Sequence, residues 1–372
     1  MTKIDPYFAD ELKKYGAEDF EACFNCGNCT AVCSLTEQSL FFPRMMIRLG
    51  ILGLKKEILA SPEPWLCYSC GDCSETCPRQ ANPGQFMAAV RRYAIASYEP
   101  TGITKLMFRS SSWFILITLT ISIFLGFFLL ILKPETEVTR WIFTYLPYDV
   151  IHFIGLIIIT ITGVSVIWGM AAMIIRFRKN SVNTSPQKVP FLKAIRAVIH
   201  EIATMKRYQS CDKEEGSFWK QKPFYLKPWF IHWSIMWGFI GLLAATILDF
   251  LLKDPASTIW WPSRIIGTMA GLLMLFGSSL AIFYRLKKIP KVYDETCLAD
   301  WIFLFFIWIA GVTGFWLEIS VALEADILVN HVVFIIHTVI SMELVLLFAF
   351  SKFAHAVYRP LALFFYFKKQ SA

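Results

Sequence analysis

The sequence predicts a mainly α-helical protein made of a small cysteine-rich domain and a bundle of six transmembrane helices. Three observations lead to this prediction. Eight of the ten cysteines lie in two short runs near the N-terminus. The chain is 56% hydrophobic with a mean hydropathy of +0.52, which is too apolar for a soluble domain. Six long uncharged stretches follow one another through the rest of the chain.

The two cysteine runs share the spacing C-x2-C-x2-C-x3-C. This spacing is typical of proteins that hold two [4Fe–4S] clusters, in which the fourth cysteine of each run ligates the other cluster. We therefore expect two clusters with crossed ligands. The expected ligands are Cys23, Cys26, Cys29 and Cys77 for cluster one, and Cys67, Cys70, Cys73 and Cys33 for cluster two.

Zinc and disulfides are the alternative uses of these cysteines. Structural zinc usually takes two C-x2-C pairs, which would leave the third and fourth cysteines of each run superfluous. Disulfides need an oxidising compartment, and the N-terminus has no apolar signal segment. Gly27 and Gly71 lie inside the runs, where the backbone has to wrap tightly around a cubane. Cys211 and Cys297 lie outside the runs and are interpreted as ordinary thiols.

Residues 1–105 are predicted to form the cluster domain. The insert between the runs, Ser39–Ser61, has apolar residues at mixed helical spacing and no strand-like alternation. The tripeptide Asn82-Pro83-Gly84 is predicted to open another helix. Because the insert is longer than in small bacterial ferredoxins, we expect a helical ferredoxin-type domain rather than the compact βαβ form.

Residues 106–372 are predicted to form the membrane domain. A helix needs about 20 apolar residues to cross the bilayer core, and a buried soluble core cannot account for six such stretches in succession. The last stretch is expected to continue past Glu343 to about His355. The six stretches are Trp113–Leu132, Val150–Ile175, Trp229–Leu248, Ile265–Tyr284, Trp301–Leu317 and Ile327–Met342.

The loops predict the orientation in the membrane. Segment 176–228 carries twelve Lys and Arg residues, whereas the loops on the opposite side carry few. The positive-inside rule then places both termini, the cluster domain and this loop in the cytoplasm, with the spans in the inner membrane. Within the loop, FLKAIRAVIHEIATMKRY is predicted to be an interfacial helix against the lipid. The net charge of +8 is thus assigned to the membrane surface and not to nucleic acid.

Four of the six histidines are predicted to hold two b haems. His337 and His355 are 18 residues apart, which is five turns of one helix, or about 27 Å of rise. They would therefore lie on one side of the sixth span, near opposite membrane faces. Matching depth across the other spans pairs His152 with His337 in an outer haem, and His232 with His355 in an inner haem. His331 is the competitor for the outer site, although it faces about 120° away.

Both halves resemble known redox proteins. CFNCGNCTAVCSL and FFPRMMIRLGILGLKKEILASPEPWLCYSCGDCSETCPR resemble the C subunit of heterodisulfide reductases. The membrane half resembles the cytochrome b subunit of those enzymes and the gamma subunit of respiratory nitrate reductase, and the His337–His355 spacing matches. The fusion of both parts resembles the C subunit of the quinone-interacting membrane-bound oxidoreductase (Qmo) complex. One difference is Leu242, which stands where the nitrate reductase subunit has a second haem ligand.

The resemblance implies electron transfer between menaquinone and cytoplasmic flavin and iron–sulfur subunits similar to QmoA and QmoB, towards adenylylsulfate reductase in sulfate respiration. Two alternatives stay open. One is a membrane redox subunit of the heterodisulfide reductase or Dsr (sulfite-reduction) type. The other is a membrane anchor whose clusters are structural. The direction of electron flow does not follow from the residues, because it depends on the potentials.

A quinone site is expected at the outer face. The outer haem, the acidic Glu318, Glu324 and Asp326, and Arg264 at the start of the fourth span would meet there. Arg264 lies about where the resembled nitrate reductase subunit has a quinol-contacting lysine. Its alternative role is to anchor the fourth span at the interface. Glu343 lies within the bilayer region, where it is expected to relay protons or to pair with a polar group on another helix.

Overall fold

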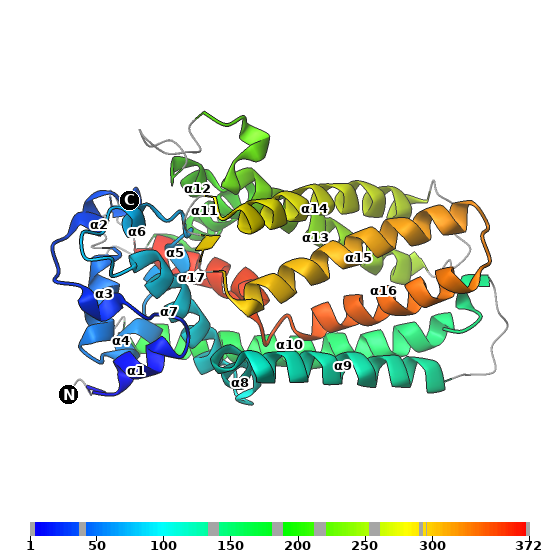
Figure 1. The fold of residues 1–372 in the computed structure, drawn as a ribbon, viewed down its shortest axis with the longest axis horizontal. Helices are drawn as coiled ribbons and strands as arrows, with labels where there is room; N and C mark the ends of the chain where they lie inside the picture. Colours follow the sequence, from blue (N-terminus) through cyan, green and yellow to red (C-terminus); the bar gives the residue numbers. More distant parts are fainter. Residues whose placement is uncertain are drawn as a thin grey trace.

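The computed structural model describes residues 4–36, 42–132, 141–180, 189–211, 221–252, 261–289, 293–294 and 296–369. Within these ranges the chain is helical and contains no strand, which confirms the predicted class. Parts of the predicted cytoplasmic loop 176–228 fall outside the described residues. The cluster domain lies at one end of the molecule, and the long helices run away from it side by side (Figure 1).

Short helices build the cluster domain around an aromatic and aliphatic core. Its fully buried side chains include Phe8, Trp65, Phe86 and Tyr98. The predicted helix after Asn82 is present as α7, and the Asn82 side chain accepts a hydrogen bond from the backbone N–H of Gln85 at 3.4 Å. The helices are α1 (Phe8–Lys13), α2 (Asn28–Ala31), α3 (Arg44–Ile51), α4 (Lys55–Leu59), α5 (Glu63–Leu66), α6 (Asp72–Glu75), α7 (Pro83–Tyr98) and α8 (Ile103–Arg109).

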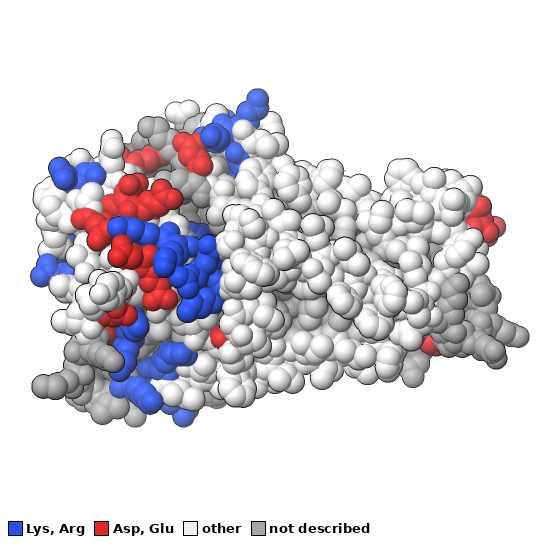
Figure 2. Space-filling view, turned by 60° about the horizontal axis from the view of Figure 1, so that its bottom comes forward, with Lys and Arg blue, Asp and Glu red and all other residues white. Residues whose placement is uncertain are grey.

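Six helices are long and apolar enough to cross a membrane, as predicted. They are α9 (Ser111–Ile131), α10 (Tyr148–Asn180), α13 (Pro228–Leu252), α14 (Pro262–Lys287), α15 (Leu298–Ala322) and α16 (Leu328–Leu346). On the face shown in Figure 2, charged side chains gather at the cluster-domain end, and the bundle is almost free of them. An uncharged belt of this kind is compatible with a multi-pass membrane protein.

The sixth span differs from the prediction, because it does not continue to His355. Helix α16 ends at Leu346, and the chain resumes as a 3-10 turn (Lys352–Ala354) and then α17 (His355–Lys369). Ser351 has extended backbone, and its side chain accepts a hydrogen bond from the N–H of Phe353 at 3.2 Å, so it caps a new turn. His337 and His355 therefore lie on different helices, and the five-turn argument for their shared face does not apply.

The core of the cluster domain includes side chains of the membrane domain, from α10, from the helix in the loop and from the C-terminal helix. Tyr358, Ala362 and Leu363 of α17 belong to the same buried cluster as the aromatic core of the cluster domain. The predicted helix in the loop is present as α11 (Phe191–Thr204), followed by α12 (Lys206–Cys211). Val198 of α11 is buried in this core, whereas Phe191 and Ile199 of the same helix are exposed. Helices α11, α12 and α17 thus lie at the junction between the two halves (Figure 1).

Candidate functional site

The four cysteines predicted for cluster two line one cavity. Cys33, Cys67, Cys70 and Cys73 surround it together with Met87 of α7 and other apolar residues. Gly71 begins α6 with φ of 98°, a left-handed conformation that glycine adopts without strain. The backbone can therefore turn back around the cavity, as expected for a run that wraps a cubane.

The cysteines predicted for cluster one also gather. Helices α2 and α6 are joined by a hydrogen bond from the Asn28 side chain to the carbonyl oxygen of Thr76. This contact brings Cys77, which follows Thr76, next to the first run. Burial raises the pKa of the Cys29 thiol, and the nearby Cys23, Cys26 and Cys77 raise it further. The grouping agrees with the expected exchange of the fourth ligand, which remains a prediction.

The donor set fits clusters better than a single ion. Among the described residues, no three His, Cys, Asp or Glu side chains converge closely enough to hold one metal ion. Cysteines around a cubane bind different irons, so their sulfurs need not converge on a point. Burial also raises the pKa of the Cys73 thiol. Because iron binds the thiolate, filling the cavity has to release protons.

Sequence reasoning missed the position of Cys211. It is buried and lines the cluster-two cavity, and it lies close enough to Cys70 to raise the pKa of that thiol. Its sulfur also lies 3.5 Å from the hydroxyl oxygen of Ser34. No spacing in the sequence indicates this, because α12 reaches the cavity only through the tertiary fold. Cys297 lies elsewhere, 3.6 Å from a guanidinium nitrogen of Arg92.

The structure brings together the two histidines predicted for the inner haem. The ring centres of His232 on α13 and His355 on α17 are 6.1 Å apart. Metal–imidazole bonds are about 2 Å long, so two imidazoles on opposite sides of one metal have ring centres about 6 Å apart. The Nδ1 atom of His355 lies 2.6 Å from the carbonyl oxygen of Lys352, which leaves Nε2 to face His232 or a metal between them.

The two histidines predicted for the outer haem, His152 and His337, also have Nδ1 next to an oxygen of the protein. Their rings do not pack on each other. Nδ1 of His337 lies 2.9 Å from the hydroxyl of Thr313, and Nδ1 of His152 lies 2.8 Å from the carbonyl oxygen of Tyr148. Metal-bound histidines usually donate their second nitrogen in this way. The ring of His152 packs on Tyr148 and Phe250 rather than on His337. The outer pairing therefore remains a prediction.

The remaining polar residues at the far end of the bundle form separate pairs. Nε2 of His331 lies 2.8 Å from the carboxylate of Asp326, and its ring contacts Trp141 and Tyr145. The hydroxyl of Thr268, one turn after Arg264, donates to Glu318. Within the bundle, Glu343 is fully buried and accepts a hydrogen bond from Ser122 of α9.

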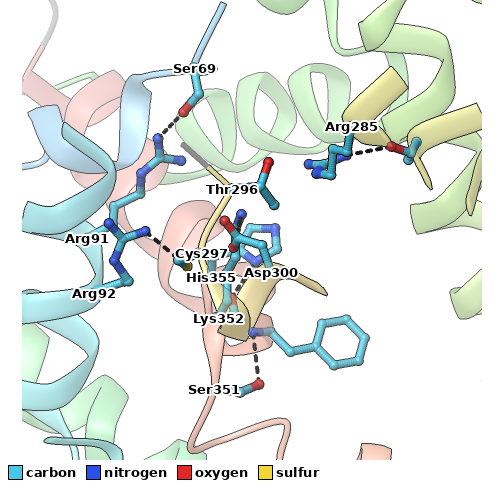
Figure 3. A network of polar contacts seen from close by, with 12 residues as sticks. Ser69, Arg91, Arg92, Arg285, Thr296, Cys297, Asp300, Ser351, Lys352 and His355 are labelled. Atoms are coloured by element: carbon cyan, nitrogen blue, oxygen red, sulfur yellow. Dashed lines mark hydrogen bonds and ion pairs between the residues drawn. The ribbon is translucent and has the colours of Figure 1, made fainter. Parts of the chain in front are cut away.

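A network of polar contacts lies between Ser69 of the second cysteine run and His355 (Figure 3). Arg91 of α7 donates to the hydroxyl of Ser69 at 2.6 Å, and its neighbour Arg92 reaches Cys297. Lys352, three residues before His355, forms a 2.6 Å ion pair with Asp300 of α15. Asp300 is mostly buried, so this pair fixes the turn that precedes His355.

Comparison with known proteins agrees with the cysteine geometry. A family model described as a 4Fe-4S dicluster domain matches residues 19–81. A protein of Archaeoglobus profundus described as similar to the C subunit of heterodisulfide reductase is 36% identical over 111 residues, which are 28% of this chain and 59% of the relative. The C subunit of the H(2):CoB-CoM heterodisulfide,ferredoxin reductase of Methanothermobacter thermautotrophicus is 39% identical over 77 residues, which are 21% of this chain and 42% of the relative.

A third relative is the C subunit of the ferredoxin:CoB-CoM heterodisulfide reductase of Methanosarcina acetivorans, 31% identical over 75 residues, which are 20% of this chain and 30% of the relative. The matched segments span between 30% and 59% of the length of these three relatives. No solved structure matches it significantly. The matched segment contains both cysteine runs, which line the gathered sites described above. The N-terminal part of the chain is therefore a 4Fe-4S domain of the kind found in the C subunit of heterodisulfide reductases.

Proposed function

We propose that this chain is a membrane electron-transfer subunit that passes electrons between a quinone and soluble redox subunits. The cluster domain would hold two [4Fe–4S] clusters. The bundle would hold two b haems, an inner one on His232 and His355 and an outer one on His152 and His337. The relatives are subunits of reductase complexes, which supports the electron-transfer part of this proposal.

The inner histidine pair is the observation that carries the proposal. Two imidazoles from different helices meet at the junction of the bundle and the cluster domain, and Tyr208 connects them to the cavity of cluster two. Histidines in membrane segments are uncommon and usually functional. A structural anchor would need neither the pair nor its position beside the cysteines. A haem between these rings would bring the electrons of the membrane pool to the cluster domain.

The full assignment is to a subunit like that of the Qmo complex. In this assignment the bundle lies in the inner membrane, with both chain termini in the cytoplasm, and menaquinol is the membrane substrate. The soluble partners are flavin and iron–sulfur subunits similar to QmoA and QmoB, with adenylylsulfate reductase as the indirect acceptor in sulfate respiration. The charged cluster-domain end and the uncharged belt in Figure 2 agree with this orientation.

The proposed quinone site lies at the far end of the bundle, close to Arg264. Its neighbours Thr268 and Glu318 are hydrogen-bonded, which holds a carboxylate near the start of α14. The His331–Asp326 pair lies at the same end and offers a second route for protons. Quinol oxidation releases two electrons and two protons, so the site needs acceptors for both.

The decisive experiment is purification of the native complex, followed by a reduced-minus-oxidised spectrum and reduction by a menaquinol analogue. We expect a b-haem band with two haems per chain, and clusters that become reduced only after the haems. Arg264→Ala is expected to slow haem reduction by the quinol while leaving haem content unchanged. A complex without a b-haem band would instead support a membrane anchor with structural clusters.

The names of the relatives favour one alternative, a subunit of a heterodisulfide reductase-like complex. That function uses the same clusters and the same membrane half but delivers the electrons to a different catalytic subunit. A Dsr-type complex is a further variant of this alternative. Identification of the co-purifying subunits decides among them. Flavoproteins similar to QmoA and QmoB support the main proposal, and a heterodisulfide-reducing or DsrK-like subunit supports the alternative.

A further inference from the structure

One tyrosine in the second cysteine run contacts three helices of the membrane half, α11, α12 and α17. Tyr68 lies between Cys67 and Cys70 and lines the cluster-two cavity. Its hydroxyl donates to the buried carboxylate of Glu201 on α11. Its ring stacks on that of Tyr208 on α12, with ring centres 4.6 Å apart. Both of these partners belong to the membrane half, so Tyr68 is a point of contact between that half and the second cysteine run.

Arg359 of α17 completes this arrangement. Its guanidinium carbon lies 3.8 Å from the centre of the Tyr68 ring, within the range of a cation–π interaction. Its two terminal nitrogens donate to the backbone oxygens of Cys67 at 3.2 Å and of Leu66 at 3.4 Å. Arg359 therefore places a positive charge beside a predicted ligand of cluster two and fixes the backbone of that ligand.

The same elements reach the inner histidine pair. Arg359 follows His355 by four residues, so both side chains lie on one face of α17. The ring of Tyr208 lies 6.2 Å from that of His232, ring centre to ring centre. Helices α12 and α17 thus each contact Tyr68 of the second run and also take part in the histidine pair or contact it.

We propose that Arg359 is a positioning residue for cluster two that the membrane half supplies, and that its charge raises the reduction potential of this cluster. The inference rests on the predicted ligands of the clusters and deepens the proposed function. A reduced cluster carries one more negative charge than the oxidised one, so a nearby cation stabilises the reduced form. The four predicted ligands of cluster one make no described contact with Arg359.

The test is a redox titration of the full-length chain, purified with its partner subunits and followed by electron paramagnetic resonance with chemical mediators. We expect Arg359→Gln to lower the midpoint potential of cluster two, to leave cluster one unchanged and to keep both clusters bound. Arg359→Lys should recover most of the shift, because it restores the charge. Arg196→Gln on α11, an exposed arginine, is the control and should shift neither potential.

Three results would overturn the inference: an unchanged cluster-two potential in Arg359→Gln, an equal shift of both clusters, or the same shift in Arg196→Gln. If the Arg359→Gln protein cannot be purified in folded form, the same titration is carried out on Arg359→Lys and Tyr208→Leu. Tyr208→Leu should then change the signal of cluster two and not that of cluster one, and an unchanged cluster-two signal counts against the inference. Mediators reduce the clusters without quinol. If the cluster-two potential shifts in Arg359→Gln but the complex contains no haem, the proposed function is rejected and the inference stands. If the complex contains haem but the potential does not shift, the inference is rejected and the proposed function stands.

Discussion

Three of the four predicted haem histidines differ from His331 in the ring nitrogen that is engaged. In His152, His337 and His355, the Nδ1 atom contacts an oxygen of the protein. In His331 the engaged atom is Nε2, which faces Asp326. Because a helical histidine can reach the carbonyl oxygen one turn earlier only through Nδ1, Nε2 is left to point away from the helix. This difference favours His152 over His331 as an outer haem ligand.

Replacement of single histidines tests the haem assignment. His355→Ala should reduce the haem content from two per chain to about one, because a bis-histidine haem is lost with either ligand. His152→Ala should remove the other haem. Pyridine-haemochrome analysis and the low-spin signals of each variant give the measurement. His331→Ala is the matched control and should keep both haems, whereas two haems in His152→Ala with one in His331→Ala would reverse the assignment.

The gathered cysteines make a second prediction at this scale. Cys77→Ser should damage cluster one, although Cys77 belongs to the second run, because it lies next to Cys29. Electron paramagnetic resonance with iron determination would show about four irons lost, with the cluster-two signal retained. Cys297→Ser should keep both clusters. If Cys77→Ser removes only the cluster of the second run, the ligands are not exchanged.

Among the helices, α13 and α14 pack most closely. A Cβ atom added at Gly238 would lie 2.6 Å from the backbone nitrogen of Met274 and 2.8 Å from the oxygen of Ala270. Small residues at such positions let membrane helices approach closely. Since α13 carries His232, this contact also determines where one inner haem ligand lies. A glycine on α10, Gly163, has nothing within 4 Å of the corresponding position.

Enlarging Gly238 should separate these two helices. We expect Gly238→Leu to destabilise the bundle by about 1–3 kcal/mol or more, the usual cost of overpacking. The displaced His232 should lower the inner haem content. Thermal unfolding in detergent and the haem spectrum measure both effects. Gly163→Leu should change neither, and an equal loss in both variants would mean that the close contact is not the cause.

The helices could be predicted from the sequence, because hydrophobic length is a local property that needs no knowledge of neighbours. The break after α16 could not, because it depends on the capping hydroxyl of Ser351 and on the Lys352–Asp300 ion pair from another helix. The gathering of the cysteines could be expected from their spacing alone. Spacing could not predict which distant residues lie at the second run, namely Cys211, Glu201 and Arg359. Tyr68 and Glu201, for example, are 133 positions apart in the chain.

At the scale of the whole molecule, the core of the cluster domain extends across the predicted boundary near residue 105. Tyr358 of α17 lies 5.4 Å from both Trp65 and Tyr98, ring centre to ring centre, and all three are buried. The cluster domain therefore completes its core with side chains from near the other end of the chain. A shared core restrains the motion of the clusters relative to the bundle, which is what a fixed electron-transfer distance requires.

Tyr358→Ala tests whether this shared core holds the cluster domain in place. Truncation of a large buried aromatic residue costs about 3–5 kcal/mol, and here the cost should fall on the cluster domain, although the change lies in the membrane half. We expect the clusters to be released at a lower temperature and the N-terminal part to be cleaved faster by protease, while the b-haem spectrum is retained. Phe191→Ala, at an exposed aromatic residue of α11, is the control and should behave like the parent. Equal cluster release in Tyr358→Ala and the parent would mean that the cluster domain is stable without the bundle, and the fixed distance would then have to come from the Tyr68 contacts alone.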